Sequence, residues 1–269
     1  MEALSKGLGV LMKREVNARA RVTTIAPCPS GSDVQLASCA AILRDCHPRV
    51  PFKFTMSISE RLYIRWIPDE PSEPTSTLVL TTPRHRHFVD LRLSSPSLAT
   101  LEWGFSGRSV GTPTHGKWIH EISSRTDHPD GEADEGDMFP HPTLPDVELE
   151  RGRMRHPDTG EIREYEEAWK AVPVVPGGGG GPRPLKGDKR VSVWLEMQNA
   201  ATDRRGSIVR VGQYCQGIVS DGSKVSVQRW MWTDGTWTKV GQIGDFDIPC
   251  DATWSTLDEG EAREHNGDA

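Results

Sequence analysis

Cys215 is the residue of this sequence whose type and setting come nearest to a nucleophile. It lies in "GQYCQGIVSDG", residues 212–222. A cysteine attacks as its thiolate, so a catalytic cysteine needs a cation or a helix N-terminus beside it. In a β-strand, the residues that share the face of Cys215 would be mostly small and apolar: Val209, Val211, Gln213, Gly217 and Val219. Burial among such residues keeps a thiol protonated, so the pattern predicts an inert core cysteine.

Histidines and acidic loops are the next candidates, because they could hold a metal ion. His85 and His87 in "PRHRHF" would share one face of a strand, but arginines flank them and disfavour a bound cation. The acidic loop "DHPDGEADEGD", residues 127–137, lacks the ligand spacing of an EF-hand. The sequence therefore predicts no metal site and no cofactor.

Paired carboxylates could perform acid–base chemistry if one of them were buried and its pKa shifted. The run from Glu161 to Glu167 is rich in glutamate, but nothing in the sequence marks one of them as buried. The chain also lacks Gly-x-Ser-x-Gly, His-Glu-x-x-His and Gly-x-Gly-x-x-Gly motifs. No catalytic residue is assigned.

The elements that would position these residues are strands. Between residues 56 and 172, apolar residues alternate with polar ones in "RLYIRWI", "HFVDLRL", "TLEWGFSG" and "KWIHEIS". This period of two predicts an antiparallel sheet with one buried face, which must close on itself as a barrel to bury that face. In "REYEEAWKAV", residues 163–172, the spacing fits either a strand or a helix.

Composition breaks divide the rest of the chain. Residues 1–55 show no sustained period and are predicted to be a disordered or poorly ordered extension. Residues 173–188, with five consecutive glycines, are predicted to be a linker. Residues 189–269 alternate again, with Asp-Gly hairpin signals, and predict a second, shortened β-barrel.

Composition also excludes several classes of partner. The formal net charge is −6, so no general basic field would attract nucleic acid. No stretch of about 20 apolar residues predicts a membrane-spanning helix. The five cysteines show no Cys-x-x-Cys spacing, which is typical of free thiols in a reducing compartment. We expect a cytoplasmic, partly nuclear protein that binds neither nucleic acid nor membrane.

Several blocks resemble a small fungal family named for interaction with a yeast casein-kinase-1-type kinase, the HRI-one type. They are "LEWGFSG", "GKWIHEISSRT", "DEGDMFPHP", "LERGRMRHPDTGEIREYEEAWKAV" and "RVGQYCQGIVSDG", in that order between Met56 and Cys250. The resemblance implies an all-β fold of two consecutive lipocalin-like antiparallel β-barrels, without established catalytic residues. It also implies a casein-kinase-1-type kinase as partner. The chain departs from the pattern where a last strand would follow, so the second barrel is expected to be incomplete.

Two classes of function remain open. The first is a non-enzymatic β-barrel that acts as a binding or protein-interaction module. The second is a barrel-cavity enzyme, such as a cyclase or isomerase, or a carrier for a small apolar metabolite, with His120 or a carboxylate as proton donor in the enzyme. A barrel of about eight strands can be filled by side chains or hold one ligand. If it holds a ligand, the expected lining is Trp66, Trp103, Phe105, Trp118 and His120.

Overall fold

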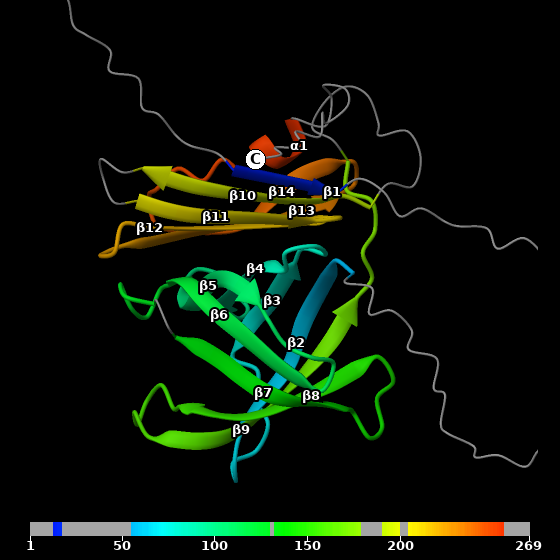
Figure 1. The fold of residues 1–269 in the computed structure, drawn as a ribbon, viewed down its shortest axis with the longest axis vertical. Helices are drawn as coiled ribbons and strands as arrows, with labels where there is room; N and C mark the ends of the chain where they lie inside the picture. Colours follow the sequence, from blue (N-terminus) through cyan, green and yellow to red (C-terminus); the bar gives the residue numbers. More distant parts are fainter. Residues whose placement is uncertain (1–12, 18–54, 130–131, 179–189, 200–203, 256–269) are drawn as a thin grey trace, which may run out of the picture.

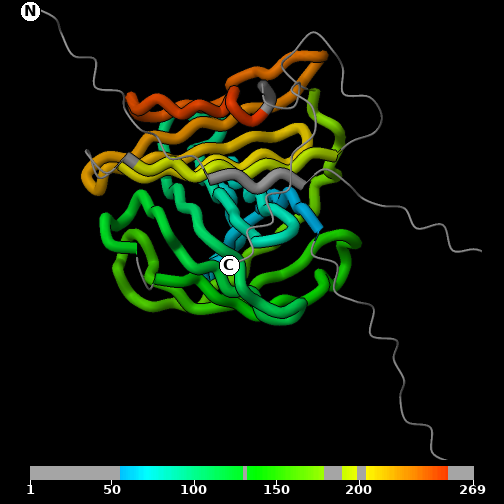
Figure 2. The backbone as a smooth tube through the Cα atoms, turned by 45° about the horizontal axis from the view of Figure 1, so that its top comes forward, coloured from blue at the N-terminus to red at the C-terminus, as the bar shows by residue number. Residues whose placement is uncertain are grey.

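The computed structural model describes residues 13–17, 55–129, 132–178, 190–199 and 204–255. They form an all-β protein with a closed eight-stranded barrel and an open six-stranded sheet. The sheet lies across one flank of the barrel, and two views show the same two-layer arrangement (Figures 1 and 2). No helix in the described part of the chain is long and apolar enough to span a membrane.

The barrel is an antiparallel meander in which each strand pairs with the next and the last strand pairs with the first. Its closure confirms the barrel predicted from the alternating strands. "REYEEAWKAV" lies in a strand, as one of its two spacings predicts. The strands are β2 (Ser57–Trp66), β3 (Thr75–Thr81), β4 (His87–Ser94), β5 (Leu101–Ser109), β6 (His115–Ser123), β7 (Ala133–Pro140), β8 (Val147–Arg155) and β9 (Ile162–Val172).

The second region forms an open sheet instead of a shortened barrel. Asp234 and Gly235 connect its last two strands, and both have positive φ (52° and 81°), as a tight hairpin turn of the Asp-Gly type requires. In order across the sheet the strands are β1 (Lys13–Asn17), β10 (Ser192–Asn199), β11 (Arg204–Val211), β12 (Tyr214–Ser220), β13 (Val225–Thr233) and β14 (Thr236–Ile243).

Strand β1 comes from the segment predicted to be an extension without order. It pairs antiparallel with β10, from Lys13 opposite Glu196 to Asn17 opposite Ser192. For these five residues the prediction is wrong, because they form a strand. The backbone groups of β10 at the edge of the sheet are free to bond to a chain that extends beside them, and β1 does so. The other residues predicted to be disordered, apart from Thr55, lie outside the described part of the chain.

The sheet stays open because both of its faces are covered. One face packs on the outside of β3 and β4, and we call this apolar contact the barrel–sheet interface. A short C-terminal segment with α1 (Ala252–Ser255) covers the other face, where Ile248 and Cys250 are buried against the sheet (Figure 1). The buried residues of the barrel–sheet interface are Ile58, Leu78, Leu80, Val89, Leu91, Leu93, Ile122, Val209, Val211, Ile218 and Val227.

Two polar side chains of the sheet also cross this interface. The Gln216 amide donates to the carbonyl oxygens of Leu78 (2.9 Å) and Val89 (3.0 Å). Arg229 donates from Nη2 to the carbonyl oxygen of Leu91 (2.7 Å) and from Nε to the side chain of Gln216 (2.6 Å). These bonds satisfy polar groups that would otherwise be costly to bury, and they fix the position of the sheet on the barrel.

Bulges in two strands change which side chains share a face. In β2, the pairing with β9 shifts between Arg61 and Tyr63, so Leu62 packs outside the barrel. In β6, the pairing with β5 shifts so that Ile122 faces the barrel–sheet interface while His120 contacts Phe105. The expectation that regular alternation places all the apolar residues of each run together is therefore wrong at both strands.

Candidate ligand-binding cavity

The barrel interior is polar where β4 lines it. The apolar residues Val89 and Leu91 of β4 belong to the barrel–sheet interface, on the outside of the barrel. Phe88, Asp90 and Arg92 alternate with them and line a cavity inside. The expectation that the apolar face of each strand is the inner face is wrong here, because β4 has a second sheet against its outer face.

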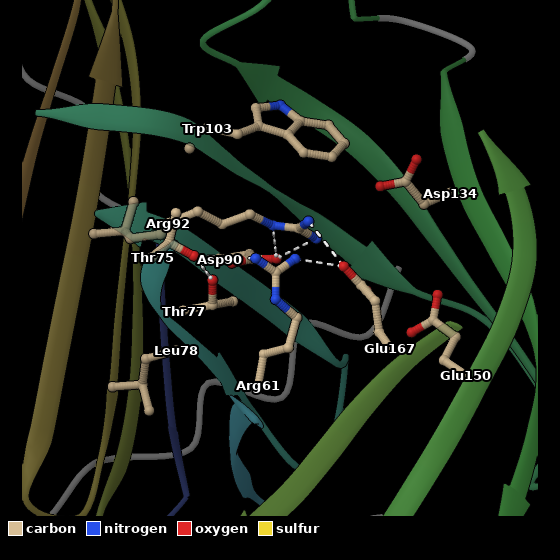
Figure 3. A network of polar contacts seen from close by, with 12 residues as sticks. Arg61, Thr75, Thr77, Leu78, Asp90, Arg92, Trp103, Asp134, Glu150 and Glu167 are labelled. Atoms are coloured by element: carbon tan, nitrogen blue, oxygen red, sulfur yellow. Dashed lines mark hydrogen bonds and ion pairs between the residues drawn. The ribbon is translucent and has the colours of Figure 1, made fainter. Parts of the chain in front are cut away.

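Two arginines and three carboxylates form an ionic network across the interior, and Figure 3 shows the part made by strand residues. Arg61 of β2 donates from Nη1 to Glu167 of β9 (2.5 Å) and from Nε to Glu73 (2.7 Å). Arg92 contacts the same Glu167 oxygen at 3.1 Å and Asp90 at 3.2 Å. Buried charges are stable only when paired and hydrogen-bonded, and these four strand residues largely satisfy one another.

Glu150 of β8 has a different environment, made of neutral donors. The Tyr165 hydroxyl donates to its Oε1 (2.6 Å) and the Trp169 indole donates to its Oε2 (3.0 Å). Gly152 allows this arrangement, because a Cβ at that position would lie 2.8 Å from the Tyr165 hydroxyl oxygen. Among the described residues, no arginine or lysine forms an ion pair with Glu150.

The electrostatics follow from this burial. Desolvation, reinforced by the charge of Glu167, raises the pKa of Glu150 to about 8. Desolvation also raises the pKa of Asp90 to about 6, although the Arg92 guanidinium opposes that shift. The carboxylates on the two sides of the interior therefore differ: Glu150 holds a proton near neutral pH, while Asp90 is largely ionised.

A cavity of about 370 Å³ opens beside this network. Its wall combines aromatic rings with charged side chains, as ligand sites with a few oriented polar groups do. Trp118 lies along the wall over Gly116, where a Cβ would meet the indole ring at 2.2 Å. The aromatic residues of the wall are Phe88, Phe105, Trp118, Tyr165 and Trp169, and its charged residues are Arg86, Asp90, Arg92, Asp134, Glu148, Glu150 and Glu167.

The five residues predicted to line a cavity fall into two groups. Trp103, Phe105 and His120 are buried together, with the Phe105 and His120 rings 4.5 Å apart and the Trp103 and Phe105 rings 4.3 Å apart. Trp118 packs against the same cluster. Trp66 is separate, and its ring contacts His156 (4.6 Å) and Tyr165 (6.3 Å).

Only two of those five residues, Phe105 and Trp118, line the cavity itself. The barrel is thus filled in one part and hollow in another, and both interiors weighed from the sequence occur in the same molecule. His120 lies in the filled part. Its Nε2 is 3.3 Å from Oδ2 of Asp134 without the alignment of a hydrogen bond, and its Nδ1 has no partner among the described residues.

Sequence reasoning missed the charged half of the cavity. Glu167 belongs to the acidic run in which no buried member could be recognised, yet 2% of its surface is exposed. Its partners Arg61 and Arg92 are 106 and 75 positions away, so local spacing carries no signal of the network. The alternation of Tyr165, Glu167 and Trp169 along β9 was the usable signal, because it places a glutamate between two aromatic rings on one face.

Two other predicted sites can be placed. Cys215 is buried against Val219 and Cys250 on the outer face of the sheet, as expected of a core cysteine. The expectation that Val209 and Val211 share its face is wrong, because a turn separates β11 from β12 and both valines lie in the barrel–sheet interface. The buried Arg210 lies opposite Cys215 on the neighbouring strand. Within the described residues, no group of three or more histidine, cysteine, aspartate or glutamate side chains is arranged to hold a metal ion.

Comparisons with known proteins agree with this architecture. A family model described as Protein HRI1 matches residues 57–269. The crystal structure of an uncharacterized protein from Saccharomyces cerevisiae is similar, with a TM-score of 0.53 and 17% sequence identity, covering 71% of this chain and 86% of that one. At this identity the likeness shows the fold alone. A search of curated proteins found no match.

Proposed function

This chain belongs to the Protein HRI1 family, and we propose that it is a non-enzymatic binding module whose barrel holds one small molecule. The observation that carries the proposal is the cavity of about 370 Å³, which lies within the usual range of roughly 300–1,000 Å³ for small-molecule sites. A lipocalin-like role, in which a β-barrel encloses a ligand, is the finer form of this proposal.

The ligand is polar at one end. A wholly apolar ligand would separate Asp90, Arg92 and Glu167 from water without replacing any of their hydrogen bonds, which costs free energy. A ligand with one polar or charged group and one aromatic or aliphatic body fits both halves of the wall. We therefore favour such a molecule over the purely apolar metabolite expected from the sequence.

A substitution at the mouth of the cavity tests the proposal. Ala171 lines the cavity and its neighbour Lys170 is exposed on the same strand without lining it. We expect saturation-transfer NMR with a library of aromatic fragments to give hits for wild type and Lys170→Trp, and far fewer for Ala171→Trp. Equal hits for the two tryptophan variants, or none for wild type, would reject the cavity as a binding site.

A second candidate function, a barrel-cavity enzyme, is favoured by one observation. Glu150 carries a proton near neutral pH and faces the cavity, so it meets the requirement for a general acid. Time-resolved NMR of any ligand found in the screen would decide between the two. Chemical conversion that is lost in Glu150→Gln would support an enzyme, and unchanged ligand after prolonged incubation would support a binding module.

The partner implied by the resemblance and the location expected from the sequence stay proposals. A casein-kinase-1-type kinase could dock on this protein without using the cavity. A pull-down with the purified kinase domain, compared between wild type and Ala171→Trp, would test both the contact and its independence from ligand binding. Fluorescence microscopy of the tagged chain would test the expected cytoplasmic and nuclear distribution.

A further inference from the structure

The lining of the cavity has an excess of negative charge. Among the described residues, five carboxylates contribute to the wall but only two arginines and no lysine: the residues are Asp90, Asp134, Glu148, Glu150, Glu167, Arg86 and Arg92. Arg61, behind the wall, adds a third cation through its contact with Glu167. Even with Glu150 protonated, negative groups outnumber positive ones.

The interior arginines are already engaged. Arg92 contacts Asp90 Oδ2 and Glu167, and Arg61 contacts Glu167 and Glu73. At Arg61 and Arg92, an anionic ligand would have to displace one of these carboxylates. Arg86, the other arginine of the wall, donates from Nη2 to the Ser109 hydroxyl (2.9 Å). The part of the wall around this network is therefore unsuited to a carboxylate or phosphate ligand.

One carboxylate oxygen in the wall has no hydrogen-bond partner in the part of the chain that the structure describes. Asp90 is only 2% exposed and lines the cavity, and its Oδ2 accepts from Arg92. Its Oδ1 has no hydrogen-bond partner among the described residues. A buried, ionised oxygen of this kind is costly unless a donor reaches it, so a donor group on a ligand would satisfy it.

Aromatic rings surround the same space. Phe105 lines it from β5, Trp118 from β6, and Tyr165 and Trp169 from β9. The negative face of an aromatic ring attracts organic cations, most strongly where water is excluded. The Arg92 guanidinium already lies over the Phe105 ring, 5.4 Å from its centroid, so this aromatic environment accepts a cation, and the carboxylates favour a cationic nitrogen over a neutral or anionic group.

We propose that the ligand is a small organic amine, bound as its cation with the nitrogen near Asp90 Oδ1 and its apolar body against Phe105 and Trp118. This inference rests on the proposed function and adds the chemical class of the ligand. Inorganic cations fit less well, because the described residues include no cluster arranged as a metal site.

Calorimetry with three probes of similar size tests the charge preference. We expect phenethylamine to bind about tenfold or more tightly than phenethyl alcohol, since a hydrogen bond to a charged group outweighs a neutral one by about this factor. Phenylacetate should not bind. Tighter binding of the alcohol or of phenylacetate would overturn the inference while leaving a small-molecule module in place. No binding of any probe would also overturn it, and the fragment screen with Ala171→Trp decides separately on the cavity.

A matched pair of variants locates the cation. Asp90→Asn removes the buried charge, whereas Asp137→Asn makes the same change at an exposed residue that does not line the cavity. Asp90→Asn should lose about tenfold in affinity for phenethylamine and keep its affinity for phenethyl alcohol, which shows that the cavity is still folded. Asp137→Asn should match wild type. Equal amine affinity in the two variants would overturn the placement at Asp90.

A pH series provides an independent readout on the unaltered protein. Benzyltrimethylammonium carries a permanent charge, so any pH dependence of its affinity arises from the protein. The groups that face Glu150 are Tyr165, Glu167, Arg92 and Asp134. Burial raises the pKa of Glu150 to about 8, and a nearby cation favours its ionised form.

The affinity of wild type should therefore rise about tenfold between about pH 6.5 and about pH 8.5, with release of a proton on binding. In Glu150→Gln this rise should be largely absent, with any residual dependence arising from Asp90 near pH 6. An affinity of wild type that is constant over this range, or that falls, would contradict the inference.

Discussion

Leu91→Ala tests whether the barrel and the open sheet are one folding unit. Leu91 is completely buried in the barrel–sheet interface, and its own carbonyl oxygen accepts a hydrogen bond from Arg229. This bond and those of Gln216 hold the barrel and the open sheet at a fixed separation. The two layers therefore cannot easily move into the space that the leucine side chain leaves. We expect a loss of about 3–4 kcal/mol in the free energy of unfolding, in the upper part of the range for such a change. The corresponding fall in Tm is roughly 6–16 °C for a chain of this size.

The assay combines denaturant unfolding with hydrogen exchange detected by mass spectrometry. Leu91 lies in β4 of the barrel, so peptides from β12 of the open sheet report on the other layer. We expect a single unfolding transition and loss of exchange protection in both strands. Leu144→Ala is the matched control, because it removes the same atoms from a side chain that is 44% exposed and should change stability by less than about 0.5 kcal/mol.

A change confined to the barrel would refute this reasoning. If β12 kept its full protection in Leu91→Ala while β4 lost it, the open sheet would be stable without the barrel. Two separate transitions, only one of them shifted, would lead to the same conclusion. A loss below about 1 kcal/mol would show that the interface repacks, contrary to the pinning inferred from Gln216 and Arg229.

Three further predictions follow from burial. The folded-state pKa of Glu150, about 8, lies above its ordinary value of 4.5, so the folded protein keeps a proton that the unfolded chain releases; stability measured with denaturant should fall from about pH 5 to about pH 8, and fall less in Glu150→Gln. Cys215 and Cys250 are buried, and burial raises the pKa of the Cys250 thiol, so brief alkylation read by mass spectrometry should leave both unmodified until denaturant is added; labelling of native Cys215 would revive the nucleophile hypothesis. Residues 189–269 expressed alone should aggregate in light scattering, since the apolar face around Ile218 loses its cover, and a monomeric, cooperatively folding fragment would show the opposite.

Much of the barrel follows from the sequence, because its strands alternate locally. In "HFVDLRL", the alternation separates Val89 and Leu91 from Asp90 and Arg92, and the structure keeps that separation. What the alternation cannot give is which set faces the barrel interior. That depends on the second sheet, which covers the apolar set from outside and leaves the charged set inside.

The candidate site was harder to predict for a related reason. Phe105 and Trp118 could be recognised as wall residues, since aromatic residues on an inner strand face are a local signal. The bulge in β6 is not visible in the run that contains His120 and Ile122, although it sends the two side chains to different faces. The partners of Glu167 come from β2 and β4, and only barrel closure brings those strands together with β9.

The cover on one flank of the barrel makes its strands unequal in the substitutions that they tolerate. Seven of the eight positions of β4 are buried, because each side chain meets either the cavity or the open sheet. In β7, on the uncovered flank, Gly136 is the one buried position. Random mutation followed by selection for folded protein should therefore leave β4 nearly invariant while β7 diversifies. Ligand specificity should therefore change during evolution through substitutions at inward residues of the uncovered strands, such as Asp134 and Met138. Substitutions at Asp90 should be rarer, because they also disturb a buried strand.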